Sequence, residues 1–181
     1  PIFGILAGKY GLKKIYMLGL LITGSSFLIL FFMGWTLLTA IIPLLLIGIG
    51  FSAIILLRPP IVADIIDFDE TITGKRRETS YAGMNAVIEK PAISLANWLF
   101  LIIIASYGFK DQATTQSSQA QLGIMIALTI IPGILIVIAA VVMKFYPLDG
   151  PEWKQKKLEI SKIHEEKEKK YLEYLREKGK I

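Results

Sequence analysis

Long apolar blocks alternate with short charged segments along the chain. Four blocks carry almost no charge, at residues 15–35, 37–63, 81–107 and 121–146. Each exceeds the roughly 20 residues that a helix needs to cross a hydrocarbon core about 30 Å thick. Backbone groups inside a membrane must be satisfied within the protein, and the blocks lack the alternation of membrane strands. The pattern therefore predicts an all-α membrane protein with four transmembrane helices.

The two ends of the chain differ from these blocks. Residues 1–8 are apolar but too short to cross a membrane, so we expect the cytoplasmic end of a helix that begins upstream, and a chain that is the C-terminal part of a longer protein. Residues 147–181 are highly charged, with apolar positions and Glu-to-Lys pairs near helical spacing. Residues 1–146 are thus predicted to form a partial transmembrane bundle. The tail is predicted to be an amphipathic cytoplasmic helix, either on the anionic inner leaflet or free in solvent.

Basic residues predict the orientation of the bundle. Three lysines precede the first block, residues 75–77 join the second to the third, and the basic tail follows the fourth, whereas the opposite loops hold only Lys110. By the positive-inside rule the tail is cytoplasmic and the polar loop 108–120 is external. With 54% hydrophobic residues, the protein is expected to be integral to a membrane, the plasma membrane in particular. This topology also accounts for the net charge of +5, so no nucleic-acid partner is expected.

Several kinds of chemistry are disfavoured by the composition. The chain has no cysteine, which removes disulfides, thiol catalysis and cysteine metal sites. Its single histidine, His164, lies between Lys162 and Glu165 in the tail and is predicted to sit on a solvated helix face. The spans hold no Ser/His pair, paired catalytic aspartates or histidine-rich cluster, so neither an enzyme, nor a metal site, nor a cofactor is predicted.

Lys90 is a charged residue in the middle of the third block. It lies about ten residues, or roughly 15 Å, from the cytoplasmic start of that block near Ser80. A charge at that depth costs at least about 2.5 to 3.5 kcal/mol on insertion scales. We therefore expect Lys90 to face a water-filled cavity or a carboxylate partner.

The polar residues that follow Lys90 share its helix face. Ser94, Asn97 and Trp98 come four, seven and eight residues later, a spacing that predicts one wall of a polar cavity for a substrate or coupling ion. Two alternatives remain open: Lys90 forms a purely structural ion pair, for example with Glu89, and the others only pack against neighbouring helices.

The second block also carries features of its own. Arg58 lies six residues before Asp64 near the cytoplasmic end, which favours a side chain that snorkels to the interface over a functional one. The Pro59–Pro60 pair is expected to break or kink the helix. Gly48 and Gly50 are expected to permit close helix approach.

The loop after the second block resembles a known family of transporters. Residues 63–83 are similar to the cytoplasmic loop between the tenth and eleventh helices of the glycoside-pentoside-hexuronide:cation symporters. The matching residues are Asp64, Ile66, Asp67, Phe68, Glu70, Thr73, Gly74, Arg76, Glu78, Tyr81 and Gly83. Ile88–Lys90 is similar to a hydrophobic-x-Lys motif in the eleventh helix, whose lysine lines the polar cavity of the family.

A second segment resembles the wider major facilitator superfamily. Gly4, Gly11, Lys13 and Lys14 stand at corresponding places of its Gly-x-x-x-Asp-Arg-x-Gly-Arg-Lys loop, with Gly8 where that motif has its acid. The resemblance implies that the four spans correspond to helices nine to twelve of a twelve-helix major facilitator fold, whose N-terminal half is missing from this chain.

The resemblance also implies an activity. A sugar or glycoside would bind between the two halves and be coupled to Na⁺ or H⁺, with Lys90 competing with the cation for carboxylates of the missing half. Two other functions stay open: a major facilitator transporter of a lipid or other small solute, and a non-transporting membrane scaffold or sensor.

Charged residues of the loop are candidates for an inner gate. Asp64, Asp67 and Glu70 at one helix end are expected to face Arg76 and Arg77 at the next. Ion pairs that form when the cytoplasmic side is closed and break when it opens would bias alternating access. The alternative is solvated loop charge, since exposed pairs contribute only about 0 to 1 kcal/mol.

Overall fold

The computed structural model describes residues 2–178, and every regular element in that range is a helix. The helices are α1 (Ile2–Tyr10), α2 (Leu12–Met33), α3 (Leu37–Thr73), α4 (Glu78–Ser106), α5 (Ser118–Met125), the π-helix η1 (Ile126–Ile130), α6 (Ile131–Met143) and α7 (Pro151–Glu177). Residues 1 and 179–181, which belong to the first and last predicted segments, lie outside the described residues. The predicted all-α fold is confirmed.

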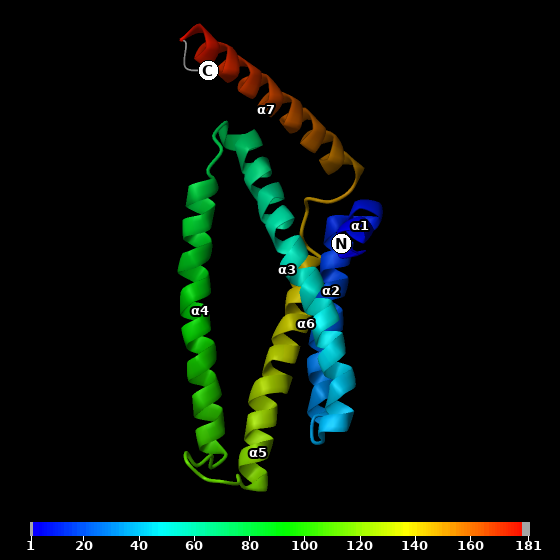
Figure 1. The fold of residues 1–181 in the computed structure, drawn as a ribbon, viewed down its shortest axis with the longest axis vertical. Coiled ribbons are helices and arrows are strands. Elements are labelled where there is room, and N and C mark those ends of the chain that lie inside the picture. The colour runs from blue at the N-terminus through cyan, green and yellow to red at the C-terminus, as the bar shows by residue number, and fades with distance from the viewer. Residues whose placement is uncertain (1, 179–181) are drawn as a thin grey trace.

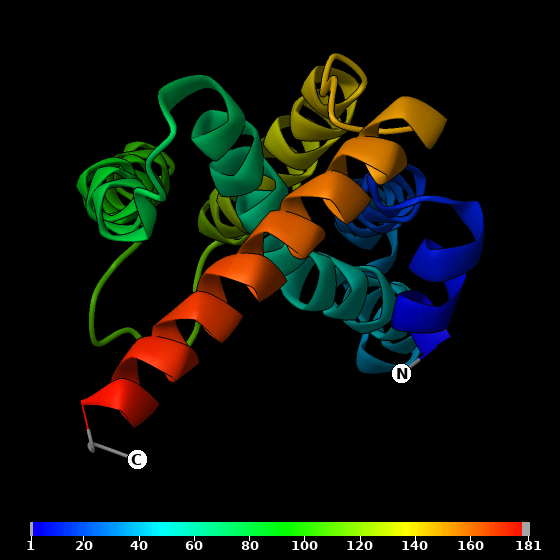
Figure 2. The same cartoon turned by 90° about the horizontal axis from the view of Figure 1, so that it is seen from above.

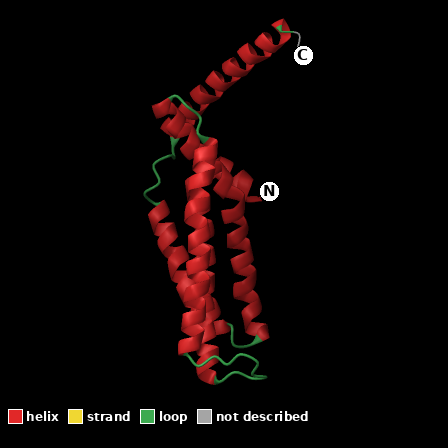
Figure 3. Ribbon diagram, turned by 90° about the vertical axis from the view of Figure 1, so that its left-hand side faces the viewer, coloured by secondary structure: helices red, strands yellow, loops and turns green. Residues whose placement is uncertain are grey.

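Four helical stretches are long and apolar enough to cross a membrane: Leu12–Met33, Leu37–Thr73, Glu78–Ser106 and Ser118–Met143. They overlap the four predicted blocks. The last stretch comprises α5, η1 and α6 in succession, and its π-turn lies just before Pro132, which has no N–H to continue the regular bonding. Figure 3 shows the stretches running alongside one another, with their loops gathered at the two ends.

α3 is longer than the apolar block that predicted it. It begins after Thr36, whose hydroxyl accepts a hydrogen bond from the Thr39 N–H at 3.4 Å. It ends at Gly74, which takes a left-handed conformation (φ 67°) and donates its N–H to the Glu70 carbonyl at 2.8 Å. The helix has 37 residues, or about 55 Å, so its last turns project beyond a 30 Å core.

Pro59–Pro60 lies within α3 without ending it, so of the two predicted outcomes, a break or a kink, the break does not occur. Each proline removes only its own N–H donor, and the turns on either side keep theirs. Figure 1 shows the second half of α3 leaning toward the side of α4.

α2 is the centre of the bundle because glycines let two helices approach it closely. On one side, a Cβ added at Gly50 of α3 would lie 2.4 Å from the Thr23 hydroxyl oxygen. On the other, a Cβ at Gly24 would lie 3.1 Å from the carbonyl oxygen of Gly133 in α6. Thr23 is fully buried, and its hydroxyl donates to the Gly19 carbonyl at 2.8 Å. These contacts hold α2, α3 and α6 together as one packed unit.

α4 stands apart from that unit (Figure 1). Of its residues only Ile104, near its C-terminal end, is buried. Its polar face is therefore open in the part of the protein that this chain supplies.

α7 crosses the end of the bundle at which α3 ends, as seen from above in Figure 2. Its side chains Trp153 and Ile160 form a small buried cluster with Leu148, against which Ile65 and Tyr146 pack. Burial of these apolar groups attaches the first half of the tail helix to the projecting end of α3.

Candidate functional site

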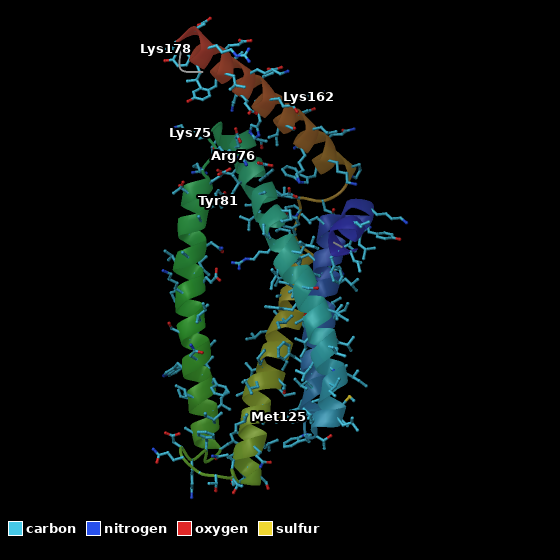
Figure 4. All side chains as sticks on the ribbon, viewed as in Figure 1. Lys75, Arg76, Tyr81, Met125, Lys162 and Lys178 are labelled. Carbon is cyan, nitrogen blue, oxygen red and sulfur yellow. The ribbon has the colours of Figure 1, made fainter. Side chains whose placement is uncertain are left out.

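Arg76 organises the loop between α3 and α4. Its guanidinium donates to Asp67 Oδ1 at 2.8 Å, to Glu70 Oε2 at 3.3 Å and to Glu78 Oε1 at 2.5 Å. Hydrogen bonds to Glu78 and Asp67 raise the pKa of Arg76 above its ordinary value, although burial opposes them. Figure 4 places Arg76 and Lys75 at the end of α3 that faces α7. The structure thus brings together three of the five predicted gate residues: Asp67, Glu70 and Arg76.

Arg77 binds an acid that the sequence reasoning did not single out. Its Nε donates to Asp69 Oδ2 at 2.8 Å, and its Nη2 contacts the other carboxylate oxygen. The hydrogen bond from Arg77 holds the pKa of Asp69 below its ordinary value, although burial opposes this. Asp69 falls on the same projecting end of α3 as the predicted acids, which is the signal that could have identified it.

Asp64 faces the tail instead of the loop arginines. It is 2% exposed and pairs with Lys157 of α7. The expected pairing with Arg76 or Arg77 does not occur, because those arginines lie beyond the end of α3 and Asp64 lies more than two turns earlier. The predicted gate residues therefore divide between the loop and the interface with α7.

Glu70 connects the loop to the tail. Its Oε2 is 2.9 Å from His164 Nε2, and its Oε1 accepts a hydrogen bond from Lys167 at 3.1 Å. Burial raises the pKa of Glu70, but the hydrogen bonds to His164 and Lys167 outweigh it, so that the pKa lies below its ordinary value. The three groups line a cavity of about 410 Å³ between α3 and α7.

The prediction that His164 sits on a solvated face is wrong. His164 is partly buried because Trp153, Lys157, Ile160 and His164 follow one another at spacings of four, three and four residues and so share one helix face. That face is the one that docks on α3. The sequence shows which residues of α7 share this face, but it does not show that the face packs against α3.

The predicted cavity residues lie on α4 as expected from their spacing. Lys90, Ser94, Asn97 and Trp98 are all exposed, and the Ser94 hydroxyl donates to the Lys90 carbonyl at 3.3 Å. No ion pair to Lys90 occurs within residues 2–178, and its neighbour Glu89 pairs elsewhere. The alternative that Lys90 forms an ion pair with Glu89 is therefore wrong.

Glu89 pairs with Arg58 across the space between α4 and α3. Glu89 Oε2 accepts a hydrogen bond from Arg58 Nη2 at 2.9 Å. Arg58 thus reaches sideways to α4 instead of snorkelling to the interface. The two residues are 31 positions apart on different helices, so no local pattern could have predicted the pair.

An open crevice of about 460 Å³ adjoins this pair. Asn85 and Glu89 line it from α4, Arg58 and Val62 from α3, and it extends to Arg76 of the loop. The crevice connects the Arg58–Glu89 pair with the Arg76 cluster of the loop.

Residues 1–150 match the MFS/sugar transport protein family. The match includes all four candidate spans and the loop cluster. The chain belongs to this family. It is therefore an integral membrane protein of the MFS sugar transporters, and its four long helices agree with the predicted place of the chain in that fold.

Two curated relatives of this MFS chain are similar over part of their length. The glucuronide carrier protein homolog of Escherichia coli (strain K12) is 22% identical over 161 residues, covering 88% of this chain and 35% of that protein. An uncharacterized symporter of Synechocystis sp. is 26% identical over 106 residues, covering 56% of this chain and 20% of that protein. The chain thus spans about a third or less of these relatives. No solved structure shows a significant match.

Proposed function

We propose that the complete protein containing this chain is a secondary active transporter. It carries a sugar or glycoside across the plasma membrane together with Na⁺ or H⁺, by alternating access, and its tail is cytoplasmic. The observation that supports this best is charge at mid-helix in otherwise apolar spans, at Arg58, Glu89 and Lys90. Such residues are expensive in a membrane and mark substrate or ion pathways. The printed names of the relatives, a glucuronide carrier homolog and a symporter, support the same class.

Lys90 is the proposed coupling residue on the open face of α4. Its ammonium competes with the coupling cation for carboxylates on the rest of the transporter. When the cation occupies those carboxylates, Lys90 moves away and the pocket lined by Ser94, Asn97 and Trp98 takes the sugar. Binding of cation and binding of sugar then favour each other by the same factor.

Lys90→Ala tests the proposal in the complete transporter reconstituted into liposomes. We expect accumulation of a radiolabelled glycoside against its gradient to be lost, because sugar entry no longer depends on the cation, while downhill exchange persists. Lys110→Ala, in the external loop, is the matched control and should leave both unchanged. Full cation-driven accumulation by the Lys90→Ala protein would remove Lys90 from the mechanism.

The loop cluster is the proposed inner gate. Arg76, held by Asp67 and Glu70, joins the end of α3 to the start of α4 when the cytoplasmic side is closed. Asp67→Asn weakens that junction, so we expect the inward-open state to gain occupancy by a few-fold, the scale of a weakened partly exposed ion pair of up to about 1 kcal/mol. The check is the rate at which a cytoplasmic thiol reagent labels a cysteine placed in the cavity. Unchanged labelling together with unchanged transport would contradict a gating role.

A further inference from the structure

Two adjoining cavities lie between α1 and α3. The first has a volume of about 690 Å³ and is apolar, since the hydroxyl of its one polar residue, Ser52, donates to the Ile49 carbonyl at 2.7 Å. Its walls are Ile2, Phe3, Ile49, Ser52, Ile55 and Leu56. The second, of about 440 Å³, shares Leu56 with the first and continues toward α7. Both volumes are in the range of small-molecule sites, and a long ligand fits by extending from one into the other.

The face of α1 that lines the second cavity carries almost no side chain. Gly4, Ala7 and Gly8 of α1 and the following Gly11 share one helix face, because they follow at spacings of three, one and three residues. A Cβ added at Gly8 would meet no atom within 4 Å. The sequence of α1 therefore leaves room beside α3 for a bound molecule.

Basic side chains gather where the second cavity meets the start of α7, which lies close to α1 in Figure 1. A third cavity of about 200 Å³ continues the second there. Three lysines and one carboxylate line it: Lys9, Lys14, Lys154 and Asp149. None of these lysines forms an ion pair within residues 2–178, whereas Lys157 in the wall of the second cavity pairs with Asp64. Three lysines beside one carboxylate leave an excess of two positive charges, which favours a ligand with a negative head.

The apolar and basic cavities lie at different depths along α3. The helix begins at Leu37, so a hydrocarbon core of about 30 Å, or about 20 residues, ends near Leu57. The α3 residues of the first cavity, 49–56, fall within that length. The second cavity reaches on to Pro60 and Asp64, at the level of the lipid head groups. The order of apolar and basic walls thus follows the order of chains and head group in a phospholipid.

We propose that these cavities bind one anionic phospholipid, with acyl chains in the apolar cavity and its phosphate beside Lys14 and Lys154. Basic pockets between membrane helices suit such head groups. Trp153 lines the second cavity, and its buried Nε1–H finds no acceptor within residues 2–178, so a head-group oxygen would supply one. The site goes beyond transport, and it depends on the proposed topology only for the leaflet that supplies the lipid.

Native mass spectrometry of the complete transporter tests the site, with phosphatidylglycerol and phosphatidylcholine of the same acyl chains as probes. We expect the unaltered protein to bind one phosphatidylglycerol at least about tenfold more tightly than phosphatidylcholine, since each lysine beside the phosphate contributes about fivefold. The double variant K14Q/K154Q should lose this preference. The matched control K162Q/K170Q, which removes two lysines of α7 outside these cavities, should keep it.

A second pair of variants leaves every lysine in place. Gly8→Leu fills the second cavity and should abolish the preference for phosphatidylglycerol, whereas Gly48→Leu, whose Cβ also meets nothing within 4 Å but which lines none of the three cavities, should not. Each variant should elute from size exclusion as the unaltered protein does, so that a loss of binding is not a loss of fold.

Three results would overturn the inference. They are equal affinity of the unaltered protein for the two lipids, unchanged binding of phosphatidylglycerol by Gly8→Leu, and displacement of the lipid by soluble glycerol 3-phosphate, which would show a site for a free anion. Each of them leaves transport standing, because glycoside uptake by the same preparation tests the proposed function separately.

Discussion

Glu70 is a single carboxylate on which the loop and the tail both depend. It is shared by Arg76 of the loop and by His164 and Lys167 of α7, and it is 11% exposed. A partly buried carboxylate in contact with three basic side chains stabilises the fold through all three contacts at once, unlike an isolated surface ion pair. Removing its charge should therefore loosen the tail as well as the loop.

The lowered pKa of Glu70 predicts how docking of α7 depends on pH. A carboxyl whose pKa is lowered in the folded state stabilises that state fully above its ordinary pKa of 4.5, and the contribution is lost as the pH falls through the lowered value. We place spin labels at Lys75→Cys and Ser161→Cys. The distribution of distances between them should stay unchanged as the pH falls from neutral, and should broaden once the pH falls through the lowered pKa of Glu70. Glu70→Gln should show the broadened distribution at neutral pH already, whereas Glu165→Gln should not. A distribution that narrows on acidification would contradict the assignment.

Residues close in sequence were predictable, and residues that meet across the fold were not. Asp67, Glu70 and Arg76 lie within ten positions around a helix end, so a charge pattern was enough to place them together. Glu70 and His164 are 94 positions apart, and Arg58 and Glu89 are 31. Their contact depends on where α7 and α4 pack, which no spacing within either helix encodes.

At the scale of elements, two glycines of α3 have different roles. A Cβ at Gly50 would meet the Thr23 hydroxyl and the Gly19 carbonyl of α2, whereas one at Gly48 would meet nothing within 4 Å. The sequence predicted close approach at both positions. Only the rotation of α3 against α2, set by the whole interface, decides which glycine faces the neighbour.

Gly50→Ala should therefore destabilise the bundle and Gly48→Ala should not. The added methyl at position 50 forces α2 and α3 apart, and overpacking of this kind costs about 1 to 3 kcal/mol. The midpoint of thermal unfolding in detergent measures the difference between the two variants of the complete transporter. Equal midpoints would show that α2 and α3 are not closely packed in the membrane.

The apolar blocks predicted the existence of the helices well, and their ends less well. Hydropathy detects the part of a helix that lies in lipid, so it ended the second span at residue 63. α3 runs on to Thr73 because the acids of its last turns are satisfied by the loop arginines and by α7. A helix that leaves the membrane is stabilised by contacts that a hydropathy pattern does not contain.

At the scale of the whole molecule, the loops and the tail define two opposite ends. The loop between α4 and α5 contains Ser117, and the other end carries α7 with Lys162 (Figures 3 and 4). This chain has no cysteine, so once any cysteines elsewhere in the complete transporter are replaced by serine, single cysteines can report on each end. We expect Ser117→Cys to react with a membrane-impermeant maleimide in intact cells, and Lys162→Cys to react only after permeabilisation. The reverse labelling would invert the proposed topology.

The contacts between Glu70 and α7 also set an order of events during biosynthesis. His164 is synthesised 94 residues after Glu70, and therefore after the whole of α3 and α4. Until then Arg76 of the loop is the one partner of Glu70, among those in the described residues, that has already been made. This end of the bundle therefore completes its contacts only after α7 has been made, and a nascent chain that stalls before residue 151 would leave Asp64, Ile65 and Phe68 without their partners on α7.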